Sequence, residues 1–309
     1  QFIIDHGLGP TWHARAGREE FRDSRLAAEA LYAAQQHALH DIDTVLCAAG
    51  IDHAVFKGAA NRLLLYDNPA VRACHDLDLL VRADDRIRAA TALVEAGYRA
   101  SPDEQSISRE LVLSRSGVDI DLHWGLLREG RLKGDPVPKM LDRRRRVSGL
   151  WMLDSDDALF TLLVHPAFAK HLAAWEMGLH RVLDIVAWLR SQSSNWPTVC
   201  ERLKEHGVRT AAWATLRWAT LLSAPHSIDG LDAMLVDLKP GRLREAWINR
   251  WLQGDLSARM SHAHWARLVG FSLFLHDTSH DSARALLGQR KAHRRRRDDL
   301  AAFQELLGQ

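Results

Sequence analysis

Apolar residues recur at helical spacing early in the chain and then give way to short strand-like runs. In residues 19–49 they return every three or four positions, which predicts an amphipathic helix that ends at Gly50. The apolar run 51–56 predicts a short strand, and the following pattern predicts a helix over 59–66 that stops at an Asp-Asn-Pro turn. Residues 1–18 show no periodicity and are expected to form a loosely held lead-in.

Further strands alternate with one more helix up to residue 153. Residues 75–81 alternate at first and finish apolar, which indicates a strand, and residues 86–96 follow a helical pattern. The runs 107–114 and 118–124 flank a Ser-Gly turn and predict a β-hairpin. Residues 147–153 predict one more edge strand. The first half is therefore expected to mix helices and strands.

From residue 155 onward the pattern is helical almost to the end. Most of the 11 tryptophans fall here, and we interpret them as core residues because they follow helical spacing. The sequence predicts an α+β fold: a lead-in at 1–18, a mixed sheet flanked by helices at 19–153, and an all-helical C-terminal domain at 154–309. The expected helix breaks lie near Pro166, Pro197, Gly207, Pro225, Pro240 and Gly254.

Composition and charge narrow the class of protein. The chain has 309 residues, of which 47% are hydrophobic and 26% charged, as is typical of a globular protein with a sizeable core. Its formal net charge of +2 provides no global field toward nucleic acid or membranes. Arginine runs at 143–146 and 294–297 offer contacts to phosphates, although short runs of this kind more often lie on solvated helix faces.

The cysteines and the hydropathy of the chain indicate in which cellular compartment the protein is expected. The three cysteines are far apart and form no Cys-x-x-Cys pair, which favours a reducing environment. The chain starts at Gln1 without a basic, apolar leader, so we expect no signal peptide. The most apolar stretch, 268–275, is shorter than the roughly 20 residues of a membrane span. We therefore predict a cytoplasmic protein without a membrane partner, and the sequence leaves its oligomeric state open.

Carboxylates gather on two predicted strands. Asp76 and Asp78 are two residues apart, so their side chains project from one face of a strand. Asp119, Asp121 and His123 repeat the arrangement on a later strand. Two close carboxylates repel each other, and a divalent cation with oxygen ligands, such as Mg²⁺ or Mn²⁺, relieves this. The alternative is that Asp-x-Asp merely borders a strand on a wet surface.

The turn that precedes these strands suits an anion. The sequence Phe56-Lys57-Gly58-Ala59 joins a predicted strand to the N-terminus of a predicted helix. Glycine permits close backbone approach, and the helix N-terminus and Lys57 supply positive charge. A glycine turn followed by Asp-x-Asp and a later aspartate is a composite pattern, and it favours phosphate chemistry.

On these residues the chain resembles the polymerase-β-type nucleotidyltransferase superfamily. More narrowly, it resembles a bacterial family of uncharacterised nucleotidyltransferases over residues 40–190. The shared features are Phe56-Lys57-Gly58, Tyr66, Arg72, Asp76-Leu77-Asp78-Leu79-Leu80-Val81, Gly97-Tyr98, Asp121-Leu122-His123-Trp124, His165, Lys170-His171 and Asp184-Ile185. The resemblance implies that residues 19–153 form a nucleotidyltransferase catalytic domain.

The resemblance also implies a metal-dependent reaction. A nucleoside triphosphate, with ATP as the expected one, would transfer its monophosphate to an acceptor hydroxyl or phosphate and release pyrophosphate. Asp76 and Asp78 would ligate two metal ions, and Asp121 would complete the site and help to deprotonate the acceptor. Asp119 competes with Asp121 for the third position, and Asp121 is preferred because the family's Asp-Leu-His-Trp run begins there.

Further residues are implied in nucleotide binding. Lys57 and Gly58 would line the triphosphate, and Arg72 would pair with a carboxylate or contact phosphate. His123 would orient Asp121 or contact the substrate, or else serve as a hydrogen-bonded structural histidine. One departure concerns the turn: the superfamily's usual Gly-Gly or Gly-Ser is Lys-Gly-Ala here, so a serine contact to phosphate is missing.

Several alternatives remain open from the sequence. The chain could be a catalytically silent nucleotide-binding or peptide- and protein-docking module of the same fold, or it could transfer the γ-phosphate instead. Action on RNA is a third hypothesis, disfavoured by the weak net charge. A small molecule, a peptide or RNA could be the acceptor. In the helical half, His165, Lys170, His171 and Asp184 could reach phosphates, but their spacing does not favour a zinc site.

Overall fold

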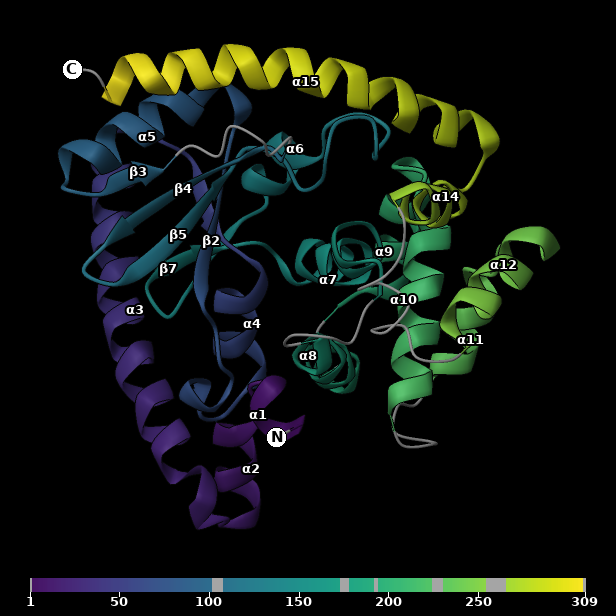
Figure 1. The fold of residues 1–309 in the computed structure, drawn as a ribbon, viewed down its shortest axis with the longest axis horizontal. Helices are drawn as coiled ribbons and strands as arrows, with labels where there is room; N and C mark the ends of the chain where they lie inside the picture. The colour runs from purple at the N-terminus through teal and green to yellow at the C-terminus, as the bar shows by residue number, and fades with distance from the viewer. Residues whose placement is uncertain are drawn as a thin grey trace. The chain divides into compact units, whose positions relative to one another are not determined.

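The computed structural model describes residues 2–101, 108–172, 178–191, 194–223, 230–253 and 265–307 (Figure 1). The chain divides into two compact units. The sheet unit comprises Leu8–Glu129, Asp135–Asp154 and Gly288–Gln309. The helical unit comprises Gln1–Gly7, Gly130–Gly134 and Ser155–Leu287. Strands and helices together confirm the α+β class predicted from the sequence.

A seven-stranded mixed sheet forms the centre of the sheet unit. Its strand order is β3-β4-β5-β2-β1-β7-β6. Two neighbouring pairs, β2 with β5 and β1 with β7, run parallel, and the other pairs are antiparallel. The strands are β1 (His53–Val55), β2 (Asp76–Val81), β3 (Arg99–Ser101), β4 (Glu110–Arg115), β5 (Val118–His123), β6 (Arg145–Val147) and β7 (Leu150–Met152).

Helices α3 and α5 bury one face of this sheet. The alternating residues Leu77, Leu79, Ile120 and Leu122 are fully buried there, together with Ile42 and other residues of α3 and α5. The opposite face of β2 and β5 carries the aspartates. The helices of this unit are α2 (Gly9–Ala16), α3 (Arg22–Ala48), α4 (Lys57–Leu65), α5 (Arg86–Glu95) and α6 (Val137–Asp142), with 3-10 turns at Glu19–Phe21, Pro69–Val71 and Ala83–Asp85.

The end of the last helix belongs to the sheet unit. Helix α15 (Ser279–Leu307) contributes its residues from Gly288 onward. Phe303 is fully buried, and its ring centroid lies 5.7 Å from that of Trp124, just after β5. Asp299 accepts a hydrogen bond of 2.7 Å from Arg86 Nε at the start of α5. This C-terminal segment thus closes the core formed by α5 and the sheet.

In the helical unit, most of the described residues form helices. These helices are α1 (Phe2–Asp5), α7 (Ser155–Lys170), α8 (Gly178–Ser191), α9 (Trp196–Glu205), α10 (Arg209–Leu222), α11 (Leu231–Asp237), α12 (Arg242–Leu252), α14 (Trp265–Phe274) and the start of α15. Trp188, Trp213 and Trp218 are buried, which confirms their prediction as core residues, whereas 40% of Trp247 is exposed. Trp175 lies outside the described residues.

Some local structure differs from the sequence-based expectation. Residues 1–18 contain α1 and α2, and α2 is stabilised by its contact with α3, where Gly9 lets the backbone approach Ser24. The expected break at Pro166 is absent, since α7 continues through this residue. A proline removes only one helical donor, and the apolar burial of α7 offsets that loss. The expected breaks at Pro225 and Gly254 lie outside the described residues.

Two strand assignments also change. The single edge strand expected over 147–153 is a β-hairpin, in which β6 forms the sheet edge and β7 pairs with β1. Strand β3 was not predicted; it has three residues, of which only Ala100 is buried. Short strands of this kind carry too little alternation to be recognised.

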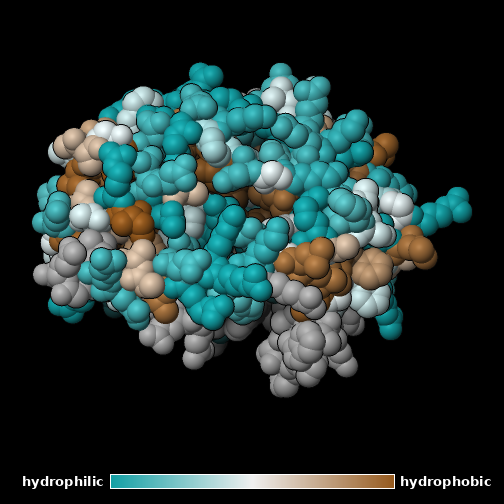
Figure 2. Space-filling model, turned by 90° about the horizontal axis from the view of Figure 1, so that it is seen from above, coloured by the Kyte–Doolittle hydropathy of each residue, from teal (hydrophilic) through white to brown (hydrophobic). Residues whose placement is uncertain are grey.

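Surface hydropathy and helix length bear on the expectation about membranes. Figure 2 shows a face on which hydrophilic residues predominate and hydrophobic ones gather in separate areas. Within the described residues, every helix is too short or too polar to cross a lipid bilayer.

A buried histidine in the helical unit couples stability to pH. His276 is fully buried between α14 and α15, and its ring centroid lies 4.9 Å from that of Phe168. Burial and the positive charges of Arg131 and Arg284 together lower the pKa of His276 from 6.5 to about 3. Arg244 acts in the same direction, while Asp281 opposes it. The folded protein therefore holds this imidazole neutral at pH values where the unfolded chain protonates it.

We expect the free energy of unfolding to decrease as the pH falls from 6.5 toward 3, because the unfolded state then binds a proton that folded His276 excludes. Replacing His276 by Gln removes this titration. Urea unfolding of both proteins at pH 7 and pH 5 measures the difference: the variant should lose less stability on acidification. Equal losses in the two proteins would contradict the assignment.

Candidate functional site

The parallel pairing of β2 and β5 brings the predicted carboxylates together. Asp76 pairs with Asp119, and Asp78 pairs with Asp121. Residues opposite each other in a ladder share one face of the sheet, so these four aspartates form one group, here called the acidic face. It lies on the side of the sheet away from α3 and α5, whose packing partners are the alternating leucines and isoleucine.

Asp78 lies at the centre of this arrangement. Only 5% of the residue is exposed, and two groups contact its Oδ1 atom. Lys57 Nζ donates a hydrogen bond of 2.6 Å, and His123 Nε2 lies 2.8 Å away. Burial alone would raise the pKa of Asp78, but Lys57 and His123 together hold it well below its usual range. Asp78 is therefore a buried, ionised carboxylate.

His123 connects Asp78 to a residue that the sequence analysis missed. Its Nδ1 atom lies 3.3 Å from Glu110 Oε2, on the neighbouring strand β4. The ring of Phe56 stands perpendicular to the imidazole, with 5.2 Å between the centroids. Glu110 could have been found by counting back from the Ser116-Gly117 turn, because the hairpin register pairs Glu110 with His123. These contacts fix the orientation of the imidazole.

Asp121 lies among other negatively charged side chains, which shift its pKa. Burial and the charges of Asp76, Asp78 and Glu110 together raise the pKa of Asp121 to about 7, and Lys57 offsets only part of this effect. One lysine therefore does not neutralise this group of carboxylates. A cation of higher charge fits such a site, and the ligand atoms of Asp78, Asp121 and His123 all lie within 4.8 Å of one another.

The two outer aspartates are more accessible. Asp76 begins β2 and is exposed, although its charge still influences Asp121. Asp119 is exposed on β5 and pairs with Asp76 rather than with Asp78. The register thus distinguishes the two candidates for the third metal-ligating carboxylate. Asp121 lies next to the buried Asp78, whereas Asp119 lies next to Asp76, near the start of β5.

The predicted phosphate turn begins α4. Phe56 ends the extended segment, and Lys57 has a φ of 52°, in the left-handed region that favours glycine. The strained backbone aims the Lys57 side chain at Asp78 and His123. Lys57 thus adopts a glycine-like backbone conformation in this turn.

Gly58 is required for a close contact. A Cβ atom at this position would lie 3.1 Å from Arg72 Nη1 and 3.2 Å from Cys74 Sγ. Arg72 is buried, and its Nη1 donates a hydrogen bond of 2.6 Å to the carbonyl of Ala73. The structure therefore brings Lys57, Gly58, Arg72, Asp78 and His123 into one region, with Arg72 packed behind the turn.

The sequence of this chain matches a known family model over residues 9–223, described as an uncharacterised nucleotidyltransferase. The match spans more than half of the chain and includes every residue of the site described above. The chain belongs to this nucleotidyltransferase family. No curated protein sequence matches it significantly.

Solved structures of nucleotidyltransferases and related proteins are also similar. The antibiotic-resistance factor ANT(2'')-Ia has 12% identity and a TM-score of 0.36, covering 71% of this chain and 96% of its own. An antigenic nucleotidyltransferase-like protein from Paracoccidioides brasiliensis has 13% identity and a TM-score of 0.40, covering 65% and 91%. JHP933 from Helicobacter pylori has 14% identity and a TM-score of 0.35, covering 79% and 97%. The family assignment rests on the sequence match alone.

Four further residues of this nucleotidyltransferase were predicted to reach phosphates. His165 and Lys170 lie on α7, His171 follows it with a φ of 53°, and Asp184 is buried on α8. All four belong to the helical unit, whereas the acidic face belongs to the sheet unit. Their part in nucleotide binding remains a prediction.

Two substitutions of Lys57 separate the effect of its backbone strain on stability from the effect of its charge. Lys57→Ala and Lys57→Gly remove the same cation from Asp78, but only alanine retains the cost of a left-handed backbone. We expect the glycine variant to be more stable by about 1 kcal/mol. Urea unfolding of the two variants tests this difference. Equal stability, or a more stable alanine variant, would show that the turn carries no such strain.

Proposed function

We propose that this protein is a metal-dependent nucleotidyltransferase that transfers a nucleoside monophosphate from a nucleoside triphosphate to an acceptor hydroxyl or phosphate, with release of pyrophosphate. The observation that carries the proposal is the pairing of Asp78 with Asp121 on parallel strands, beside the turn at Lys57. Family membership supports nucleotidyl transfer in general. The acceptor is left unspecified.

The carboxylates of the acidic face provide the ligands for metal ions. Asp76, Asp78 and Asp121 would hold one or two Mg²⁺ or Mn²⁺ ions, which prefer oxygen ligands. When bound, such ions neutralise the negative charge that develops on the phosphates and on the attacking oxygen. The raised pKa of Asp121, about 7, supports a cation requirement because it reports uncompensated negative charge. Asp119 is the less suitable third ligand because it is exposed and pairs with Asp76.

The turn before α4 suits the triphosphate. Gly58 leaves the backbone accessible, and the N-terminus of α4 adds partial positive charge. Lys57 at present neutralises Asp78. We propose that Lys57 exchanges this carboxylate for a phosphate oxygen when the nucleotide and its cation bind. Arg72, whose guanidinium lies beside Gly58, would hold the turn in place or contact a phosphate.

His123 and Glu110 would position the acidic residues. The imidazole lies between Asp78 and Glu110, so its orientation is fixed from both sides. A fixed imidazole restricts the rotation of the Asp78 carboxylate, and preorganised ligands lower the cost of ordering the substrate. In this interpretation His123 acts through Asp78 and has no direct part in the transfer of the phosphoryl group.

Asp78→Asn and Asp121→Asn should each abolish Mg²⁺-dependent turnover of the triphosphate, with a loss of at least ~100-fold. Asp119→Asn is the matched control, an aspartate two residues away on the same strand face, and it should retain most of the activity. Turnover can be measured as pyrophosphate release, with circular dichroism to confirm folding. Full activity of Asp78→Asn, or inactivity of Asp119→Asn alone, would contradict the assignment.

Labelled nucleotides show which phosphate of the triphosphate is transferred to the acceptor. Incubation of the protein and a cell extract with each nucleoside triphosphate, labelled at either the α- or the γ-phosphate, should transfer only the α-label to an acceptor. Mass analysis of the labelled product would then identify the acceptor class. Transfer of the γ-label would instead indicate a phosphotransferase, and nucleotide binding by calorimetry without any transfer would indicate a silent binding module.

A further inference from the structure

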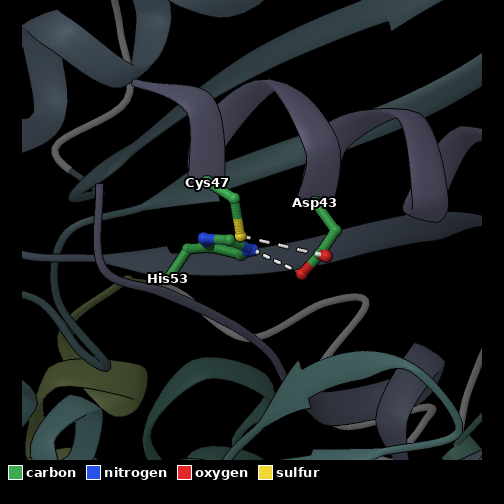
Figure 3. Close-up of side chains that lie close together, drawn as sticks. All are labelled: Asp43, Cys47 and His53. Atoms are coloured by element: carbon green, nitrogen blue, oxygen red, sulfur yellow. Dashed lines mark hydrogen bonds and ion pairs between the residues drawn. The ribbon is translucent and has the colours of Figure 1, made fainter. Parts of the chain in front are cut away.

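A second group of metal-ligating side chains lies in the sheet unit. Asp43 and Cys47 are four residues apart near the C-terminal end of α3, and His53 begins β1. Their side chains point toward one another (Figure 3), and their ligand atoms all lie within 4.8 Å. These three residues are here called the Cys47 cluster. His53 pairs with Val81, at the far end of β2 from Asp76, so the cluster is separate from the acidic face.

The distances within the Cys47 cluster are close to those around a tetrahedral ion. His53 Nε2 lies 3.0 Å from Asp43 Oδ1, and Cys47 Sγ lies 3.9 Å from Asp43 Oδ2. Zinc bonds of about 2.0–2.3 Å to nitrogen, oxygen and sulfur place neighbouring ligand atoms roughly 3.3–3.8 Å apart. Small shifts of the Asp43 and Cys47 side chains would bring these two pairs of atoms to such separations.

The orientation of His53 provides an independent argument. Its Nδ1 atom lies 3.0 Å from the carbonyl oxygen of Ile51, which only accepts hydrogen bonds, so Nδ1 carries the proton. In the neutral ring, the lone pair of Nε2 then faces the carboxylate of Asp43. A metal ion between these two atoms would be bound by both of them. A backbone carbonyl that fixes the tautomer is the usual support of a metal-binding histidine.

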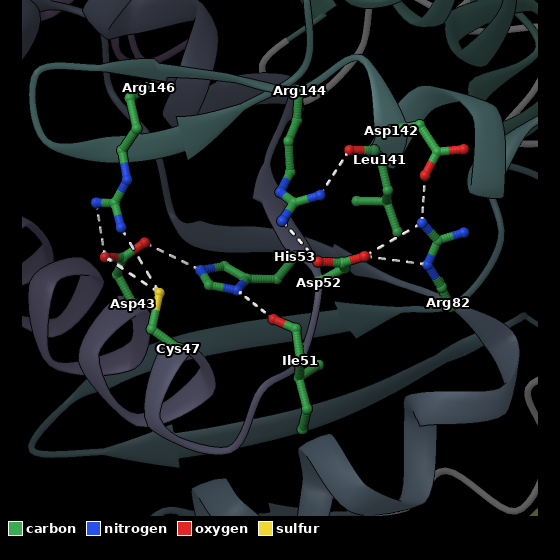
Figure 4. Close-up of polar contacts among 10 residues, drawn as sticks. All are labelled: Asp43, Cys47, Ile51, Asp52, His53, Arg82, Leu141, Asp142, Arg144 and Arg146. Carbon is green, nitrogen blue, oxygen red and sulfur yellow. Dashed lines mark hydrogen bonds and ion pairs between the residues drawn. The ribbon is translucent and has the colours of Figure 1, made fainter.

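Arg146 supplies positive charge to the same cluster (Figure 4). Its Nη1 donates a hydrogen bond of 2.9 Å to Asp43 Oδ2, and its Nη2 lies 3.6 Å from Cys47 Sγ. The guanidinium also lies 4.9 Å from the ring centroid of Trp151. Because 43% of the Arg146 side chain is exposed, it can move into solvent without breaking the core. The cluster therefore attracts a cation that a metal ion can replace.

We propose that Asp43, Cys47 and His53 form a binding site for a zinc-like transition-metal ion. One oxygen, one sulfur and one nitrogen ligand favour Zn²⁺ over Mg²⁺, which prefers oxygen alone. Binding releases the thiol proton of Cys47 and displaces Arg146 from Asp43. Cys47 is exposed, so a water molecule could reach the ion and serve as a fourth ligand. The ion would fasten the end of α3 to β1.

Cobalt(II) is the probe that distinguishes this site from the acidic face, which contains no cysteine. In the presence of excess Mg²⁺, the wild-type protein should bind one equivalent of Co²⁺ with thiolate-to-cobalt charge-transfer absorption, and Zn²⁺ should displace it. Cys47→Ser should abolish the absorption and weaken Zn²⁺ binding by at least ~100-fold. Cys200→Ser, a partly exposed cysteine in the helical unit, is the matched control and should behave as the wild type.

Arg146→Gln tests the exchange of cations. It removes the competing guanidinium and should tighten Zn²⁺ binding, while the thermal midpoint in Zn²⁺ should rise relative to the metal-free protein. Wild-type Zn²⁺ affinity in Cys47→Ser, or a cobalt spectrum without thiolate absorption, would overturn the metal site. Weaker binding by Arg146→Gln would overturn the displacement of Arg146. None of these measurements depends on nucleotidyl transfer, so their failure is distinguishable from failure of the proposed function.

Discussion

The rest of the candidate site depends on the repulsion between the carboxylates of Asp78 and Asp121. The parallel register of β2 and β5 makes them neighbours, and the core beneath them holds that register because a slip of one residue would expose Leu77, Leu79 and Leu122. Two such carboxylates need a nearby cation. Lys57 supplies one, and it reaches Asp78 only from a strained turn. The turn, the histidine and the acidic face are therefore parts of one electrostatic arrangement.

Strand faces were the part of this site most accessible from the sequence. Side chains alternate with a period of two, so the common face of Asp76 and Asp78, and that of Asp121 and His123, follows from local pattern alone. The pairing of β2 with β5 does not, because parallel neighbours are joined through long connections that no local rule specifies. Glu110 was only partly predictable. The hairpin turn specifies that it pairs with His123, but a single glutamate gives no signal of function.

Other differences arise where tertiary contacts override local pattern. Helix α2 forms despite a weak pattern because its start packs against α3 at Gly9. The arginine run at 143–146 suggested either phosphate contacts or a solvated face, yet Arg144 and Arg146 form ion pairs with Asp52 and Asp43, respectively. Both guanidinium groups also lie over the ring of Trp151. Partners about a hundred residues away in the chain cannot be read from one sequence.

At each end of the β1 segment, a basic side chain neutralises a carboxylate. Lys57 neutralises Asp78 just after the strand, and Arg146 neutralises Asp43 beside its first residue, His53. In each case a cation of the chain itself contacts one of the candidate ligand carboxylates. The ligand atoms differ, however: oxygen predominates on the acidic face, and sulfur joins nitrogen in the Cys47 cluster. Because hard and soft ligands select different ions, one short strand would separate the proposed magnesium site from the proposed zinc site.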